Sequence, residues 1–182
     1  MSLYFIALIP QYALRKQIKQ LKQEMKLQFK AKHALKSPAH ITLQRPFIRN
    51  EENELLLLNN LKEFSSIQQP FNIDLLGFGC FTPRVIFLKI ANHEPIITMY
   101  KQLKKVLIKK LGFNKTEIAS SIFPHITIAT KDLTEDAFKA AWPKFEKRAF
   151  KATFLVNSLF LLKHNGKYWD IYKEFSFKKT TD

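Results

Sequence analysis

The sequence predicts an α+β fold made of two similar lobes, and three observations support this. A short apolar segment, Ala39–Leu43, nearly recurs as Pro124–Ile128, and each copy carries a histidine and a threonine two residues apart. Each copy ends a strand–helix–strand pattern, over residues 3–44 and 84–129. Hydrophobic residues make up 46% of the 182-residue chain, which is ample for a core. We expect one bilobal domain over residues 1–182, with a cleft between the lobes.

The first unit starts with an apolar strand and continues with an amphipathic helix. We expect the strand at residues 3–9 and the helix from Tyr12 to about Lys32. Apolar residues recur along the helix at spacings of three and four: Leu14, Ile18, Leu21, Met25 and Phe29. Five lysines largely avoid that stripe and are expected on the solvated face: Lys16, Lys19, Lys22, Lys26 and Lys30. Ser37-Pro38 then breaks the pattern, and residues 39–44 form the first motif strand, which Arg45-Pro46-Phe47 ends.

A helix and two strands connect the two units. The helix is predicted from Asn53 to Phe64, followed by a loop to Pro70. Strands are predicted at residues 71–78 and 84–91, joined by a turn through Gly79 and Pro83.

The second unit repeats the order of the first. His93-Glu94-Pro95 opens a helix that runs to about Leu111, and Gly112 caps it. Residues 124–129 form the second motif strand, and a helix capped by Thr134 follows to Phe145. The C-terminal strands are expected at residues 151–163 and from Tyr168 to Phe177. Asn165-Gly166 makes the tight turn of that hairpin.

Composition limits the class of protein. The net charge of +15 favours anionic partners such as RNA or nucleotides, although a lysine-rich solvated surface would give the same charge. A single cysteine, Cys80, excludes an internal disulfide and is typical of a reducing compartment. The apolar start, Met1–Pro10, has no basic leader or cleavage site, and no apolar run approaches the ~20 residues that span a bilayer. We expect a cytoplasmic monomer without membrane contact.

The paired motifs indicate acid–base chemistry. Side chains alternate along a strand, so His40 and Thr42 share one face, as do His125 and Thr127. One imidazole can be neutral and accept a proton while the other is protonated and donates one. The hydroxyls can donate to oxygens on which negative charge develops. Neither motif has a Cys, Asp or Glu in phase with its histidine, so we expect neither a metal nor a cofactor.

Other residues near the motifs allow both a structural and a functional interpretation. Arg45 is either a solvated strand-end charge or a phosphate contact. Phe47 is either a core residue or a platform for base stacking. Tyr168 either packs within its strand or directs its hydroxyl into the cleft. The three histidines without a threonine partner are expected on the surface: His33, His93 and His164.

The two histidine-x-threonine motifs resemble those of the 2H phosphoesterase superfamily, and the branch that is most similar is 2′-5′ RNA ligase-like or RNA 2′,3′-cyclic phosphodiesterase-like. Phe78–Ile90 and Leu159–Lys163, the latter followed by Tyr168 and a final strand, extend the resemblance over nearly the whole chain. The resemblance implies two antiparallel sheets with outer helices, a central groove and no metal. It also implies substrates with a cyclic phosphate or an RNA end.

Residue roles can be transferred from this resemblance. His40 and Thr42 match the first motif, and His125 and Thr127 match the second. The family pattern implies that His125 activates water and that His40 protonates the leaving oxygen, an order that the residues themselves do not establish. A basic residue often follows the second motif in this family, and Lys131 is the candidate here.

Three hypotheses follow for the function. The first is metal-independent hydrolysis of 2′,3′-cyclic phosphates in RNA or nucleotides, with 2′-5′ joining of RNA ends as a further activity. The second is an RNA-binding module that retains the groove without turnover. The third is a related phosphodiesterase that acts on another small cyclic phosphate or nucleotide. Turnover and a substrate panel separate the three.

Overall fold

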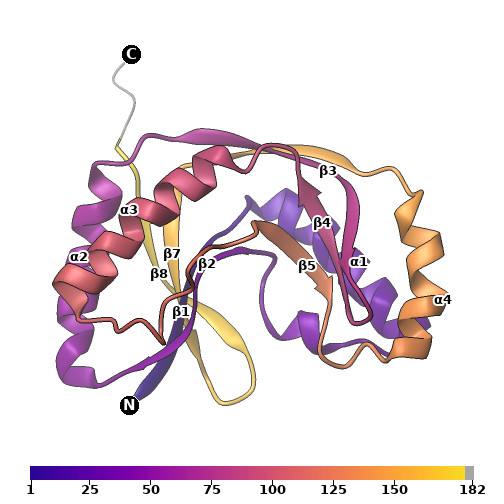
Figure 1. The fold of residues 1–182 in the computed structure, drawn as a ribbon, viewed down its shortest axis with the longest axis horizontal. Coiled ribbons are helices and arrows are strands. Elements are labelled where there is room, and N and C mark those ends of the chain that lie inside the picture. The colour runs from indigo at the N-terminus through magenta and orange to yellow at the C-terminus, as the bar shows by residue number, and fades with distance from the viewer. Residues whose placement is uncertain (179–182) are drawn as a thin grey trace.

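The structure, a computed structural model, describes residues 1–178 and contains two four-stranded sheets in which every pairing is antiparallel (Figure 1). The first sheet has the order β2 (Ile41–Arg49), β1 (Ser2–Leu8), β7 (Ser158–His164) and β8 (Trp169–Ser176). The second has the order β5 (His125–Ala129), β4 (Val85–Ile90), β3 (Phe71–Phe81) and β6 (Lys151–Val156). The predicted α+β fold with two antiparallel sheets is confirmed.

The helices are exchanged between the two sheets. Helix α1 (Tyr12–Phe29) connects β1 to β2 of the first sheet, yet it packs against β5 of the second sheet and against α4 (Glu135–Glu146). Helix α3 (Glu94–Leu111) connects β4 to β5 of the second sheet but packs against α2 (Glu54–Ser66), which covers β7 and β8 of the first (Figure 1). In each case the helix connects two strands of one sheet but packs against elements that form or cover the other sheet.

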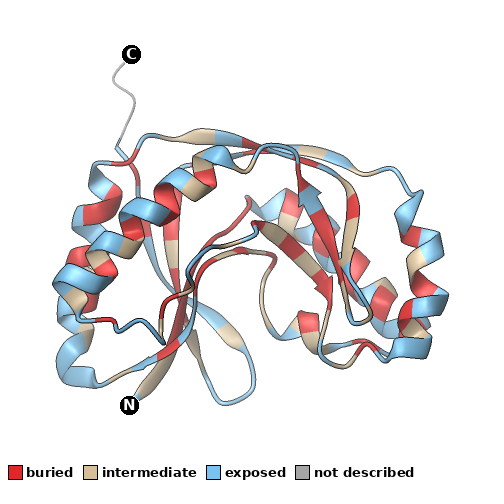
Figure 2. Ribbon diagram, in the orientation of Figure 1, coloured by how far each residue is buried: buried red, intermediate tan, exposed pale blue. Residues whose placement is uncertain are grey.

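The two motif strands meet at the centre of the molecule. β2 and β5 are the edge strands of their sheets, and they contact one another. Behind them, one continuous core extends through both sheets and all four helices. Buried positions lie on one side of each helix, and exposed positions lie on the other (Figure 2).

A second, smaller apolar cluster lies on the opposite face of β1. It consists of Phe5, Ala7, Ile9 and Leu162, with Trp169 packed against it. Thr42 is the register partner of Ala7, so this cluster lies beside the first motif strand, on the face of the sheet that carries Thr42. The motif side chains thus rest on apolar residues on the cleft side.

Three expected boundaries are wrong, each for a physical reason. β2 runs on to Arg49, because Pro46 lies at a register shift of an edge strand, where a missing N–H costs little. The expected strand 151–163 is two strands in different sheets, since the chain crosses from β6 to β7 at Asn157. The first helix ends at Phe29, because Lys30 adopts a left-handed conformation, and a 3₁₀ turn, η1 (His33–Lys36), follows.

Other local predictions are confirmed. Gly112 ends α3 with a φ of 64°. The Thr134 side chain accepts a hydrogen bond from the backbone N–H of Ala137, which caps α4. Gly79, however, lies inside β3 rather than in the turn, which falls at residues 82–84. Among the residues described, no helix combines the length and the apolar character that crossing a membrane requires.

Candidate functional site

A small cavity of about 160 Å³ lies at the motif strands. His40, directly before β2, and Thr42 of β2 line it together with Thr127 of β5. His125 precedes Thr127 by two residues on the same face of β5, and its charge contributes to lowering the pKa of His40. The structure therefore brings His40 and both threonine hydroxyls to one cavity, with His125 on the adjoining strand.

The two imidazoles are held in the same way. The Nδ1 atom of His40 lies 2.8 Å from the carbonyl oxygen of Pro38, and the Nδ1 atom of His125 lies 2.6 Å from that of Phe123. Since a carbonyl can only accept, each Nδ1 must be the protonated donor. In each neutral ring, Nε2 is then the atom that carries the lone pair and can take a proton.

A phenylalanine ring supports each histidine at the same separation. The centroid of Phe5 lies 4.8 Å from that of His40, and the centroid of Phe87 lies 4.8 Å from that of His125. Phe5 and Phe87 come from β1 and β4, the strands that pair with β2 and β5. The pseudo-symmetry of the two sheets thus extends to the side chains that pack against the motif residues.

A buried lysine lies close to His40. The Lys22 side chain is 3% exposed, and its Nζ atom donates to the carbonyl oxygens of Ala34, at 2.9 Å, and Ser37, at 3.1 Å. Burial lowers the pKa of Lys22 to about 7. Burial and the charge of Lys22 together lower the pKa of His40 to about 4. An anion in the cavity would counter both effects, because it favours the charged form of each group.

The prediction that Lys22 avoids the apolar stripe of the first helix is wrong. Lys22 follows Ile18 by four residues and precedes Met25 by three, and all three side chains are buried on the same face of α1. That spacing was the available signal. A lysine within an apolar stripe of this kind is buried only where acceptors are present, here two backbone carbonyls.

His125 lies among aromatic rings. Its centroid is 5.2 Å from that of Phe81 and 6.2 Å from that of Phe123, in addition to its contact with Phe87. Burial lowers the pKa of His125, as does the nearby His93, while the hydrogen bond to the Phe123 carbonyl opposes them. Both imidazoles are therefore biased toward the neutral form in the free protein.

The remaining predicted residues lie at different distances from the cavity. Arg45 donates to the carbonyl oxygens of Thr116 and, at 3.1 Å, of Glu117, so its guanidinium is held by a neighbouring loop. Phe47 is buried in the core against Phe113, where no base could stack on it. Neither residue is among those that line the cavity within residues 1–178.

Lys131 and Tyr168 lie nearer to the site. Lys131 follows Thr130, which lines the cavity. Burial lowers the pKa of His33, and the positive charge of Lys131 lowers it further. His33, which was expected on the surface, is half-buried and also lines the cavity. Tyr168 is exposed at the end of the β7–β8 connection and lines a neighbouring groove.

Gly79 leaves room for the ring that supports His125. A Cβ atom at Gly79 would lie 2.6 Å from the Phe87 ring, so Gly79→Ala must displace that ring. We expect kcat for phosphodiester hydrolysis to fall by about 10- to 100-fold, because small displacements of a reacting group are costly. Stability should fall by about 1–3 kcal/mol.

Steady-state kinetics, denaturant unfolding and an NMR titration of His125 would check this prediction. Cys80→Ala, at the next position of β3 on the opposite face, is the matched control. An unchanged kcat and an unchanged His125 titration in folded Gly79→Ala would show that Phe87 does not position the imidazole.

Metal ligands do not gather in the described part of the chain: residues 1–178 contain no group of three or more His, Cys, Asp or Glu that could hold an ion. The donors at the cavity are imidazoles, hydroxyls and the ammonium groups of Lys22 and Lys36.

Comparison with solved structures supports the fold. A protein of Thermus thermophilus, TT0787, superposes with a TM-score of 0.71 at 21% identity over the whole of both chains. LigT of Escherichia coli in complex with 3′-AMP superposes with a TM-score of 0.65 at 16% identity, over 98% of this chain and 99% of LigT. At such identities the likeness concerns the fold alone.

Comparison of sequences defines the class and then the family. A relative in Halalkalibacterium halodurans that carries the name of a phosphoesterase is 24% identical over 97% of this chain and 98% of its own length. A relative of the same kind in Oceanobacillus iheyensis is 26% identical over 94% and 96%. Fold and site together define a phosphoesterase of the two-histidine class. The model of the 2′-5′ RNA ligase superfamily matches residues 10–167, and the chain belongs to this superfamily.

Proposed function

We propose that the protein hydrolyses 2′,3′-cyclic phosphates at RNA ends or in nucleotides, without a metal ion. One observation carries this proposal. Two imidazoles, each fixed through Nδ1 to a backbone carbonyl and each accompanied by a threonine two residues further on, lie at two edge strands that contact one another. A reaction in which the enzyme accepts one proton and donates another needs two such groups, and the two Nε2 atoms are equivalent in this respect.

In the proposed step, His125 takes a proton from water through Nε2, as the family resemblance implies. The water oxygen forms a bond to phosphorus, and the bond from phosphorus to one ribose oxygen breaks. His40 gives its Nε2 proton to that leaving oxygen, so that a phosphomonoester and a free hydroxyl result. Thr42 and Thr127 donate hydrogen bonds to the non-bridging oxygens, where negative charge increases.

His40 can act as an acid only when its ring is protonated, so substrate binding must raise the pKa of His40. In the free protein, burial and Lys22 keep the pKa of His40 near 4, so the ring is neutral at pH 7. A bound phosphodiester brings a negative charge to the cavity and raises that pKa. His125, which is also biased toward its neutral form, is already in the state that a base needs.

The related proteins support a nucleotide substrate. The superfamily is described as one of 2′-5′ RNA ligases, and LigT is described in complexes with 3′-AMP, ATP and phosphate. Ligation would be the same ring-opening exchange at phosphorus, with a ribose hydroxyl as the attacking group in place of water, so that a phosphodiester results. The charge of +15 would favour encounters with such anions.

One experiment tests the proposal. The protein, with a chelator present, is incubated with an RNA that ends in a 2′,3′-cyclic phosphate and with nucleoside 2′,3′-cyclic phosphates. We expect hydrolysis, and the position of the phosphate in the product identifies the leaving oxygen. A strict metal requirement would refute the two-histidine mechanism. Salt-sensitive binding without turnover would instead identify an RNA-binding module, and turnover confined to another cyclic phosphate would identify a different phosphodiesterase.

A further inference from the structure

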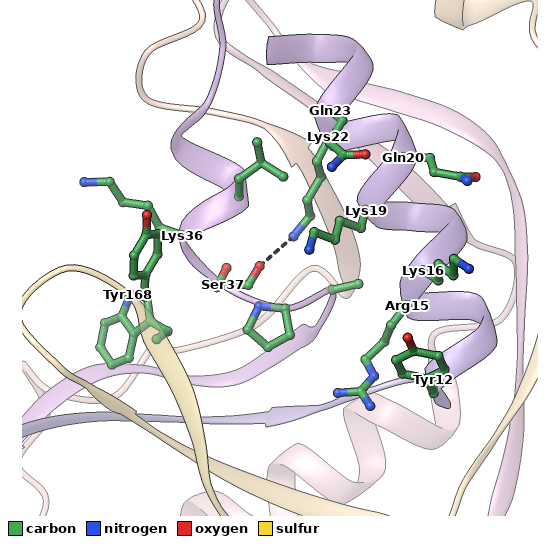
Figure 3. A pocket seen from close by; sticks show the side chains of 14 residues that line it. Tyr12, Arg15, Lys16, Lys19, Gln20, Lys22, Gln23, Lys36, Ser37 and Tyr168 are labelled. Carbon is green, nitrogen blue, oxygen red and sulfur yellow. Dashed lines mark hydrogen bonds between the residues drawn. The ribbon is translucent and has the colours of Figure 1, made fainter. Parts of the chain in front are cut away.

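A larger groove of about 540 Å³ adjoins the small cavity. It lies between α1, the segment from η1 to the start of β2, and the start of β8 (Figure 3). Four residues line both spaces: Lys22, Lys36, Ser37 and Trp169. The groove is therefore continuous with the site that contains His40.

The lining of the groove is strongly basic. Five cationic side chains contribute to it: Arg15, Lys16, Lys19, Lys22 and Lys36. None of the described residues that line it is acidic. Glu24 is the one acidic residue of α1. It does not line the groove, and its carboxylate pairs with Arg148 at 2.8 Å. The groove thus presents several positive charges that no carboxylate at the same place neutralises.

One of these cations has a donor that is buried without a partner. The Nε atom of Arg15 is shielded from solvent and makes no hydrogen bond within the described part of the chain. Leaving a buried donor unpaired costs about 1–3 kcal/mol. A movement of the Arg15 side chain that turned Nε toward an anionic oxygen in the groove would recover this cost.

Aromatic side chains lie at both ends of the basic row. Tyr12 is 73% exposed at the start of α1, and Tyr168 is 44% exposed across the groove, close to Lys36 in Figure 3. Trp169 lies where the groove meets the small cavity, with its ring packed against Phe5 at 4.7 Å. A row of cations with exposed aromatic rings is the arrangement by which proteins bind single-stranded nucleic acid.

We propose that this groove binds the single-stranded RNA that leads to the reactive end, with its backbone phosphates on the basic face of α1 and its bases against the exposed tyrosines. The inference rests on the proposed function and specifies its substrate as an RNA strand rather than a mononucleotide. Lys22, which lines both spaces, is the link between the strand site and the cavity that holds the cyclic phosphate.

A second basic surface on α3 serves as a comparison. Lys101, Lys104, Lys105 and Lys109 line another hollow there. As far as residues 1–178 are concerned, that hollow shares no residue with the small cavity. The charge on α3 could attract RNA, but it could not direct a strand into the site.

The test compares two substrates in three proteins. The substrates are adenosine 2′,3′-cyclic phosphate and a short single-stranded RNA with the same terminal group. The proteins are the native chain, a groove variant with Arg15→Gln, Lys16→Gln and Lys19→Gln, and a control with Lys101→Gln, Lys105→Gln and Lys109→Gln, which removes the same charge from α3. We expect the groove variant to raise KM for the RNA about 10- to 100-fold and to reduce its salt dependence by roughly one phosphate contact per residue.

The ratio of kcat/KM for RNA to that for the mononucleotide should fall in the groove variant and stay near the native ratio in the control. Equal losses for both substrates, or equal RNA effects in both variants, would overturn the groove proposal while leaving the proposed function intact. If the native protein turns over neither substrate, the proposed function fails. Fluorescence anisotropy of labelled RNA then tests the groove proposal. Weaker RNA binding by the groove variant alone supports the proposal, and equal RNA binding by all three proteins refutes it.

Discussion

Replacing either His40 or His125 by alanine is expected to lower kcat for cyclic phosphate hydrolysis by roughly 10²- to 10⁴-fold. In the proposed step each imidazole, held through Nδ1 by a backbone carbonyl, supplies one of the two proton transfers. The double variant should lose much less than the product of the two single losses, because the two histidines act as a unit. The fold should persist, since neither ring belongs to the hydrophobic core.

Single-turnover kinetics with a cyclic phosphate end measures the loss, and circular dichroism checks the fold. Added imidazole should partly restore the turnover of each alanine variant, which a purely structural role would not allow. Full activity in both variants would contradict the proposed chemistry. Retained activity in one variant alone would assign both proton transfers to the other histidine.

Replacing Lys22 by methionine is expected to raise the pKa of His40 from about 4 toward the ordinary histidine value, because a neighbouring positive charge is removed. The same change should raise KM for a cyclic phosphate about 10-fold or more, since an interaction of an anion with a charged donor contributes about 1.5–3 kcal/mol. An NMR titration of His40 and steady-state kinetics give the two readouts.

The pH dependence distinguishes this role from a structural one. Burial lowers the pKa of Lys22 to about 7, so the native protein loses that positive charge as the pH rises through 7. Its kcat/KM should therefore fall above about pH 7, and this fall should be absent in Lys22→Met. Lys62→Met, on the exposed surface of α2, is the control. An unchanged His40 titration in Lys22→Met would show that the two groups are not electrostatically coupled.

The features that were predictable from the sequence are those encoded locally. The two motif strands follow from a repeat of five residues, and strand alternation alone places His40 beside Thr42 and His125 beside Thr127. The caps at Gly112 and Thr134 are likewise local, because each depends on one residue and its backbone conformation.

The features that could not be predicted depend on contacts between distant segments. Two polar residues, Asn157 and Ser158, separate two apolar stretches, but this local pattern does not show that the chain passes there from one sheet to the other. The acceptors of Lys22 lie in a turn 12 and 15 residues away, and only the folded chain brings them to its Nζ atom. Arg45 shares a strand with the motif but is bonded to a loop some 70 residues further along, which no local pattern indicates.

The exchange of helices between the sheets bears on how such a molecule originates. If two copies of one strand–helix–strand unit dimerised by trading their helices, each helix would pack away from its own sheet, as α1 does against β5 and α3 does against α2. Joining the two genes would then preserve the trade within one polypeptide. On this account a two-histidine centre would begin as the symmetric interface of a domain-swapped homodimer, in which a single imidazole per subunit meets its own copy. Fusion would then let the two copies diverge, and the surroundings of the two histidines do differ here, with Lys22 near His40 and several aromatic rings around His125.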